Sequence, residues 1–254
     1  MLYGGTYTES TTESIAGGVL LENHCHAQFE LIAVFSGNVS LYPEGGMVSL
    51  SSGQAVLIPP LFYHAVDAES GGSYRRYTLL FDEAALPSPL RPVFTALHFP
   101  LCVRASDCLT RLEKVLQSER RSYYAPLADS LLTELFYRFA ELPDGQIQPE
   151  SRELADILNY IEANLNKRIT LEDIARHTAR SKSSVCHIFS ERMKISVKQY
   201  ILQKKLSYAE KCMEEGLSAS DAARAVGYEN YSNFYRMYQK VFGRSPVGKK
   251  RLPQ

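Results

Sequence analysis

The sequence predicts two domains of different class: an all-β sandwich or barrel with two appended helices, then an all-α domain with a duplicated helical unit. Three observations predict this division. Short apolar runs alternate with Gly, Pro and Ser between residues 18 and 81, apolar residues recur every three or four positions after residue 105, and one helical layout occurs twice in the second half. A chain of 254 residues, 45% hydrophobic and 22% charged, can bury the cores of two such domains.

The formal net charge of zero arises from two oppositely charged halves. Residues 1–150 carry 9 Lys and Arg against 17 Asp and Glu, a balance of −8. Subtraction from the 28 of each in the whole chain leaves 19 against 11 in residues 151–254, a balance of +8. A polar stretch with two prolines and a glycine lies at the change of sign. We therefore predict a first domain over 1–142, a linker over 143–150 and a basic second domain over 151–254.

The composition argues against several classes of protein. No apolar run approaches the roughly 18 residues of a membrane-spanning helix, and the polar start of the chain does not have the pattern of a secretory signal. The 5 cysteines are scattered without C-x-x-C spacing, which argues against a disulfide framework and against a structural zinc site. We expect a soluble protein of the reducing cytoplasm with no membrane partner.

Within the first domain, closely spaced apolar runs indicate short strands. Three examples are residues 29–35, 39–42 and 55–58, with turn signals at 36–38 and 51–53 between them. This alternation of runs and turns is typical of an all-β sandwich or barrel.

Two amphipathic helices are expected after the strands, over about residues 105–142. The residues with helical spacing are Leu109, Leu112 and Leu116, and then Leu127, Leu131, Leu135 and Phe139. Pro126 suits the first turn of the second helix, where its missing N–H has no intrahelical partner to lose.

Three histidines and a glutamate are the chemically suggestive residues of the first domain. If residues 24–30 form a strand, the alternation of side chains places His24, His26 and Glu30 on one face. Together with His64 they offer imidazole and carboxylate groups, which suit a divalent transition metal. They equally suit hydrogen bonding to an organic ligand or to neighbours inside a barrel, so both alternatives stay open.

The spacing of these residues resembles the cupin family over about residues 15–82. Gly18, His24, His26, Glu30 and Gly37 match the first cupin motif, and Gly53, Pro59 and His64 match the second. Leu61 stands where the second motif has glycine, and Ala68 where it has asparagine. The resemblance implies a cupin-type jelly-roll barrel that binds a small-molecule effector at His24, His26, Glu30 and His64. The same four residues would hold a divalent transition metal if the barrel contains one, and Tyr42, Tyr63 and Arg75 are further candidates for the pocket.

The second domain contains one helical layout twice, 48 residues apart. Thr170 and Ser218 each begin a Ser/Thr-x-x-acid pattern, which is typical of a helix start. In each copy a short break follows, and then a second helix over 182–193 or 231–242. Two short helices across a tight turn form a helix-turn-helix, so we predict such units at about 170–193 and 218–242. Further helices are expected over 151–164 and 197–213.

This organisation resembles the DNA-binding region of the AraC (AraC/XylS) family of transcriptional regulators over about residues 151–251. The second copy matches the family pattern at Val226, Gly227, Tyr228, Ser232, Phe234, Arg236, Tyr238, Gly243, Ser245 and Pro246. The first copy departs from it, with Ala179 where glycine is usual, Ser184 where an aromatic is frequent and His187 where arginine is frequent. Lys205 stands at the arginine of the family's Arg-x-x-x-Ala pattern.

The resemblance implies a sequence-specific DNA-binding transcriptional regulator, an activator rather than a repressor, and not an enzyme. The positions carried over as DNA-facing are Lys182, Ser183, Ser184, Cys186 and His187 in the first unit and Tyr231, Ser232, Asn233 and Arg236 in the second. Arg236 is expected to contact a guanine and Asn233 an adenine, whereas His187 lacks the arginine fork. The expected partners are double-stranded DNA, a small-molecule effector, a second copy of the chain bound through residues 105–142, and RNA polymerase.

Two alternative functions remain open from the sequence. In one, the four barrel residues are ligands of a metal-dependent cupin enzyme that the basic half locates on DNA. In the other, the protein binds DNA without ligand control. Metal analysis separates the first alternative from the regulator, and selection of a defined DNA motif separates the second.

Overall fold

The computed structural model describes residues 6–10, 24–44, 46–68, 74–97, 99–120, 122–141, 151–193 and 195–246. The chain divides into two compact units, one containing most of residues 1–148 and the other residues 149–254 with a few residues of the first half. Each unit is described by itself. The expected linker, residues 143–150, lies outside the described residues. In the part of the chain that the structure describes, no helix is long and apolar enough to cross a membrane.

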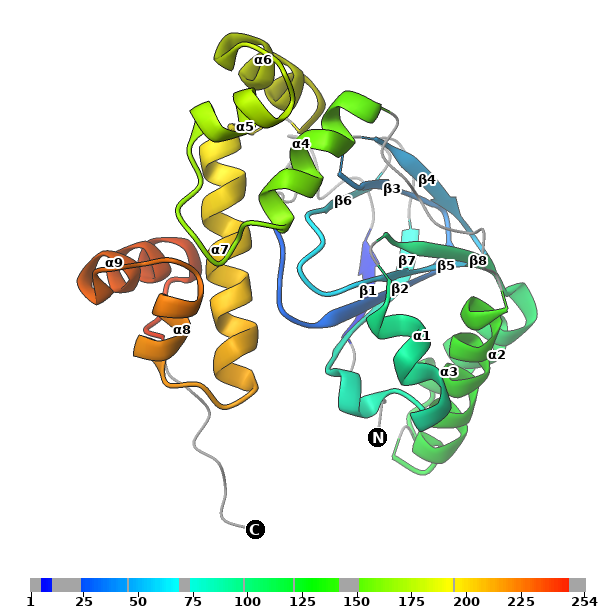
Figure 1. Cartoon of the computed structure of the whole chain (residues 1–254). Coiled ribbons are helices and arrows are strands. Elements are labelled where there is room, and N and C mark those ends of the chain that lie inside the picture. The colour runs from blue at the N-terminus through cyan, green and yellow to red at the C-terminus, as the bar shows by residue number, and fades with distance from the viewer. Residues whose placement is uncertain are drawn as a thin grey trace. The chain divides into compact units, whose positions relative to one another are not determined.

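The first unit contains two antiparallel sheets, labelled by strand in Figure 1. The strands are β1 (Thr6–Ser10), β2 (Phe29–Ser36), β3 (Asn38–Tyr42), β4 (Val48–Ser51), β5 (Gln54–Ile58), β6 (Ala65–Ala68), β7 (Tyr74–Phe81) and β8 (Leu101–Arg104). One sheet has the order β1-β7-β2-β5-β8 and the other β4-β3-β6. The predicted β-rich domain is confirmed, although β1 and β8 lie outside the region where the sequence predicts strands.

Strand β2 is buried on both of its faces. It pairs with β5 on one side and with β7 on the other, at the centre of the larger sheet. Leu31 and Ala33 belong to the apolar cluster that includes the helices of this unit, whereas Ile32 and Val34 pack with residues of the smaller sheet. A strand covered on both faces favours apolar residues on both, which explains the apolar run over residues 31–35, and Glu30 is a buried polar exception.

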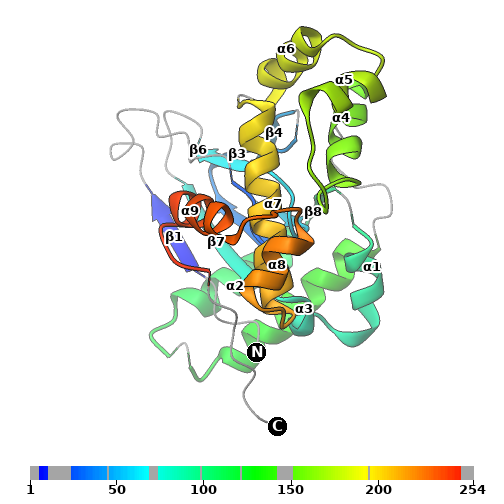
Figure 2. The same cartoon turned by 60° about the vertical axis from the view of Figure 1, so that its left-hand side comes forward.

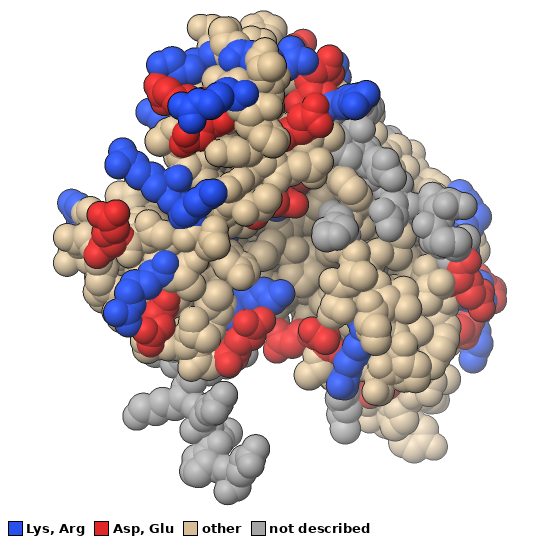
Figure 3. Space-filling view, in the orientation of Figure 1, with Lys and Arg blue, Asp and Glu red and all other residues tan. Residues whose placement is uncertain are grey.

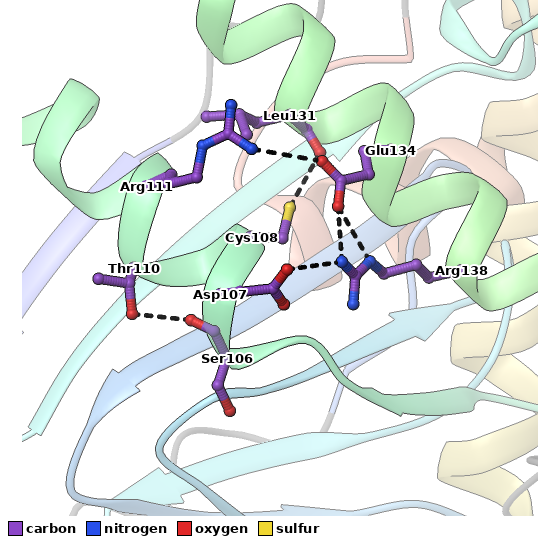
Figure 4. Close-up of polar contacts among 8 residues, drawn as sticks. All are labelled: Ser106, Asp107, Cys108, Thr110, Arg111, Leu131, Glu134 and Arg138. Atoms are coloured by element: carbon purple, nitrogen blue, oxygen red, sulfur yellow. Dashed lines mark hydrogen bonds and ion pairs between the residues drawn. The ribbon is translucent and has the colours of Figure 1, made fainter.

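Two helices, α2 (Ser106–Gln117) and α3 (Ala125–Ala140), follow the strands as predicted. They pack against one face of the larger sheet, where Leu112 and Leu135 are fully buried in the shared cluster. Figure 4 shows that Arg138 of α3 donates to Asp107 of α2 at 2.9 Å and to Glu134 of its own helix at 2.7 Å. Because such exposed ion pairs contribute only about 0–1 kcal/mol, apolar burial holds this helix pair together.

Three short helical segments between β7 and β8 were not expected from the sequence. They are η2 (Glu83–Ala85), η3 (Ser88–Leu90) and α1 (Arg91–Thr95). Each segment is too short to show a helical period, so its sequence pattern cannot be distinguished from that of a loop. Leu90 and Phe94 are buried and connect these segments to the same apolar cluster as α2 and α3.

The described residues of the second unit's C-terminal region fold into helices. They are α4 (Arg152–Glu162), α5 (Leu171–His177), α6 (Lys182–Met193), α7 (Val197–Glu214), α8 (Ala219–Ala225) and α9 (Tyr231–Phe242). The pair α5 and α6 and the pair α8 and α9 are the two predicted helix-turn-helix units, and α7 runs between them (Figures 1 and 2). The side chains of Thr170 and Ser218 cap α5 and α8 by accepting the N–H of Asp173 and Asp221. These caps are the helix starts that the repeated pattern predicts.

Both helix-turn-helix units end their first helix with the same backbone turn. After α8 the N–H of Tyr228 donates to the carbonyl of Ala223, and after α5 the N–H of Arg180 donates to the carbonyl of Ala175. These bonds define a Schellman motif, in which one residue adopts the left-handed conformation. That residue is Gly227 in the second unit (φ 75°) and Ala179 in the first (φ 52°).

Leu61 and Ala179 are the only non-glycine residues with positive φ in the described part of the chain, at 64° and 52°. Both stand where the resembled families have glycine. Both positions therefore keep the left-handed backbone conformation without glycine, the residue that adopts it most easily. An L residue held in this conformation is strained by roughly 1–2 kcal/mol.

Replacement of Ala179 by glycine is expected to raise the free energy of unfolding by about 0.5–1 kcal/mol, since glycine relieves the strain but gains entropy in the unfolded chain. Ala179 is exposed, so loss of its methyl group removes little packing. Urea unfolding followed by far-UV circular dichroism measures the change. Ala163→Gly is the matched control, because exposed Ala163 has an ordinary φ of −64° and should lose stability. A loss of stability in both variants would contradict the strain at residue 179.

Candidate nucleic-acid interface and candidate effector site

Helix α6 has a buried face and a solvent-facing face. Val185, Phe189 and Met193 are buried, which fixes the orientation of the helix on its unit. The predicted DNA-facing residues Lys182, Ser183, Cys186 and His187 are exposed, and Ser184 is half-buried at the edge of the face. The structure thus places four of the five predicted positions on one accessible helical surface.

Helix α9 has the same division. Phe234 and Tyr238 are fully buried against α7 and α8, while Tyr231, Ser232, Asn233 and Arg236 are exposed. Asn230 caps the helix by accepting the N–H of Asn233. The guanidinium of Arg236 donates to the Oδ1 atom of Asn233 at 2.5 Å. This bond orients Arg236 and uses one of its five donors.

Two of the predicted DNA-facing residues contact carboxylates of their own unit. The Nζ atom of Lys182 donates to Glu172 at 2.6 Å, and this bond raises the pKa of Lys182 and lowers that of Glu172. The Nδ1 atom of His187 lies 3.6 Å from Glu191. All four side chains are more than half exposed. Pairs of this kind add little stability, so the cations can exchange them for another anion at small cost.

Figure 3 shows Lys and Arg side chains over α5 and α6 and over α8 and α9, interspersed with acidic side chains. The exposed basic residues are Arg176, Arg180, Lys182 and Arg192 in the first helix-turn-helix unit and Arg224, Arg236, Lys240 and Arg244 in or next to the second. Both units therefore offer cations beside the faces that carry the predicted base-reading residues, as contact with DNA phosphates requires.

In the first unit, Glu30 of β2 and His64 form a buried polar pair. The Nε2 atom of His64 lies 2.8 Å from Oε2 of Glu30, and its Nδ1 atom lies 2.9 Å from the carbonyl of Phe62. Because a carbonyl only accepts, Nδ1 carries a proton. Nε2 then faces a carboxylate, and this contact is favourable when a proton or a metal cation lies between the two groups. An N–H of a ligating histidine bonded to a backbone carbonyl is also the usual support of a metal ligand.

Of the four residues predicted for effector or metal binding, Glu30 and His64 form the pair just described in the first unit. His24 and His26 belong to the second unit, where their ring centroids lie 5.6 Å apart. The predicted strand over residues 24–30 is wrong, because β2 begins at Phe29 and residues 25–28 are irregular. Strand alternation therefore does not place His24 and His26 on one face with Glu30. Gly18 of the first cupin motif lies outside the described residues.

One further pocket candidate has another role. Arg75 donates from Nε to Glu113 of α2 at 2.7 Å, so its guanidinium is held by the helix pair. Sequence reasoning missed two other residues of β7, Arg76 and Thr78. They pair across the sheet with Val34 and Ile32, which face the smaller sheet, and the buried Arg76 Nε and Thr78 Oγ1 atoms lack hydrogen-bond partners in the described structure. Arg76 and Thr78 lie two positions apart, on one face of a strand, and this alternation is the signal that could have identified them.

These observations define a class of two-domain protein. One domain is rich in sheet and carries a buried polar pair, and the other is helical and exposes the second helix of each helix-turn-helix unit. Two family models match the chain, an AraC-like ligand binding domain over residues 16–136 and a helix-turn-helix domain over residues 174–250. The chain belongs to the AraC family of transcriptional regulators.

The similar proteins differ in how much of their length is matched. The probable transcriptional regulator LumQ of Photobacterium leiognathi is 24% identical over 88% of this chain and 90% of its own length. The uncharacterized HTH-type transcriptional regulator YdiP of Escherichia coli is 32% identical over 37% of this chain, and the match spans only 31% of that relative. Among solved structures, ToxT of Vibrio cholerae is 12% identical, with 89% of this chain and 90% of that chain covered and a TM-score of 0.44.

Proposed function

We propose that the protein binds a specific DNA sequence through α6 and α9 and regulates transcription from it. The observation that carries the proposal is the pair of solvent-facing helices, each the second helix of a helix-turn-helix unit. Helix α7 has 18 residues and is therefore about 27 Å long. Units joined by a helix of this length suit two adjacent major grooves, which lie roughly 34 Å apart on one side of DNA.

Charge supports the same proposal. Residues 151–254 carry 19 Lys and Arg against 11 Asp and Glu. Neutralised phosphates release their counterions, which provides affinity for any DNA sequence. Exposed side chains such as Arg236 and Asn233 can add base recognition to this background.

Selection of bound DNA from a random pool by the full chain tests the proposal. We expect enrichment of two short conserved segments with centres about 10–10.5 base pairs apart. Lys114→Ala, a change of one charge in α2, is the control and should select the same sequence. Recovery of DNA without a shared motif would contradict sequence-specific binding and would favour a protein that binds DNA without sequence readout.

We also propose that the protein binds a small-molecule effector at His24, His26, Glu30 and His64. The buried Glu30–His64 pair and the neighbouring rings of His24 and His26 support this site. Arg76 and Thr78 would supply additional polar contacts. Because a ligand shifts an equilibrium only by its preference for one state, the effector must bind one conformation of the protein more tightly than another.

The imidazole and carboxylate groups of these four residues also suit a divalent transition metal, which would polarise bound ligand oxygens. If a metal is present, His26→Ala should weaken its binding by about 100-fold or more, since it removes a ligand rather than a supporting residue. Metal content after equilibrium dialysis against Zn²⁺ or Ni²⁺, measured by mass spectrometry, detects the loss. His177→Ala, an exposed histidine of α5, is the control. Equal metal content in all three proteins would exclude these four residues as the metal site and leave them to an organic effector.

The remaining features of the proposal follow from family membership. We propose that the protein acts in the cytoplasm as an activator, contacts RNA polymerase, works as a homodimer and has no enzymatic activity. Exposed apolar side chains in α3 and just before it, Tyr123, Leu127 and Tyr137, support a dimer contact through the helix pair. Transcription in vitro from the selected site tests the direction of control: increased transcript supports activation, and decreased transcript would make the protein a repressor. Sedimentation of the full chain tests the dimer.

A further inference from the structure

Lys205 joins the two helix-turn-helix units through its ammonium group. It lies near the middle of α7 and is buried, with 7% of its surface exposed. Its Nζ atom donates to the carbonyl of Lys167, between α4 and α5, and to the carbonyl of Val226, at the end of α8. Both distances are 2.6 Å. One side chain thus links the backbone ahead of the first unit to the backbone turn of the second.

The two linked segments also touch each other directly. A Cβ atom added at Gly227 would lie 2.9 Å from the Cα and carbonyl carbon of Lys167 and 3.2 Å from the carbonyl oxygen of Asn166. The turn after α8 therefore packs on the chain before α5 with no side chain between them. Lys205 and Gly227 form one junction, which consists almost entirely of backbone atoms.

Burial of the Lys205 ammonium group is unfavourable unless hydrogen bonds replace the hydration that it loses on transfer from water. Burial lowers the pKa of Lys205 to about 8, so the group is mostly charged at neutral pH. A methionine would fill similar space without that penalty, but it could not bind two carbonyl oxygens on opposite sides. The ammonium group of Lys205 therefore contributes the hydrogen-bonded link between the carbonyl groups of Lys167 and Val226.

We propose that Lys205 is a positioning residue that fixes the second helix-turn-helix unit against the first and so sets the distance between the DNA segments that α6 and α9 read. The proposal rests on the proposed DNA binding by both helices. Each helix-turn-helix unit packs on its own part of α7, through Phe189 on Tyr200 in the first unit and through Phe234 on the core around Leu206 in the second. Without the link, bending of α7 would change the distance between the two reading helices.

A distance measurement on the protein without DNA tests whether Lys205 fixes one helix-turn-helix unit against the other. Cys186 of α6 is the one exposed cysteine of the 5 that the chain contains, and it takes one spin label. Gln239→Cys in α9 provides the second site, with Cys102 changed to serine. The distance distribution of the full chain should be narrow with Lys205 and at least about twofold broader with Lys205→Met. Lys205→Arg, which keeps donors and charge, should restore the narrow distribution.

A binding measurement tests the consequence for DNA. Insertion of one base pair between the two selected segments should weaken binding of the original chain by about 30-fold or more, and that of Lys205→Met by less than about 5-fold. Affinity for DNA that carries only one segment should stay within about 2-fold, because each unit itself is intact. A residue that only stabilised the fold would instead weaken binding to every DNA alike.

The outcomes separate the two proposals. A narrow distance distribution in Lys205→Met, or an unchanged penalty for the inserted base pair, overturns the positioning role. A broadened distribution in a protein that selects no DNA motif supports the link but contradicts DNA binding. If Lys205→Met does not fold, Lys205→Leu, which also removes every side-chain donor, takes its place in both measurements and is judged by the same criteria.

Discussion

Gly227→Ala should lower the free energy of unfolding of the second helix-turn-helix unit by about 2–5 kcal/mol, the sum of two costs. The first is backbone strain, because Gly227 has a φ of 75° and an L residue there is strained by roughly 1–2 kcal/mol. The second is a clash, since the new methyl carbon would lie 2.9 Å from two backbone atoms of Lys167. Overpacking of this kind adds about 1–3 kcal/mol. The helical signal of the full chain in urea, followed by circular dichroism, measures the loss.

Gly243→Ala is the control that separates these two costs. Gly243 ends α9 in the same left-handed conformation, with a φ of 65°, but a Cβ atom there would meet nothing within 4 Å. We therefore expect only the strain, about 1–2 kcal/mol. An equal loss in the two variants would show that the contact between Gly227 and Lys167 places no constraint on the junction. A larger loss for Gly227→Ala would show that it does.

The helices of the second unit were predictable because their signals are local. The caps at Thr170 and Ser218 and the spacing of buried residues such as Phe234 and Tyr238 lie within a few residues of the helices they define. The strands were harder. β1 is a polar edge strand whose place depends on pairing with β7, and β8 has only four residues. Pairing partners distant in sequence decide such elements, so local patterns indicate them poorly.

The candidate site residues also divide into those that the sequence indicates and those that it does not. Helical period places Asn233 and Arg236 on one exposed turn, and the resemblance to the AraC family marked both as DNA-facing candidates. No local pattern shows that Lys205 binds carbonyl groups 38 and 21 residues away. His24 and His26 were predicted as site residues through motif spacing, although the strand assumed for them does not begin until Phe29. Motif glycines were informative even where they are replaced, because Leu61 and Ala179 keep the left-handed backbone.

Arg236→Ala is expected to weaken binding to the selected DNA by about 10- to 100-fold and to remove the preference at one base pair. A bidentate contact with guanine contributes about 1–3 kcal/mol of discrimination, and the alanine side chain cannot form it. Arg236 is exposed and already oriented by Asn233, so its loss should not affect folding. Titrations against the selected sequence and against each single-base variant measure both effects.

Two matched variants identify the source of the effect. Arg236→Lys keeps the charge but loses the planar fork, so it should retain the salt dependence of binding and still lose the base preference. Lys240→Ala removes an equal charge from the last turn of the same helix, and it should weaken binding to all sequences by a similar factor while lowering the salt slope by about 0.9. If Arg236→Ala behaved like Lys240→Ala, Arg236 would be a phosphate contact, and readout by α9 would depend on Asn233 and its neighbours. A base-specific loss confined to Arg236 variants would instead establish the helix face as the reading surface, because charge alone cannot distinguish one base pair from another.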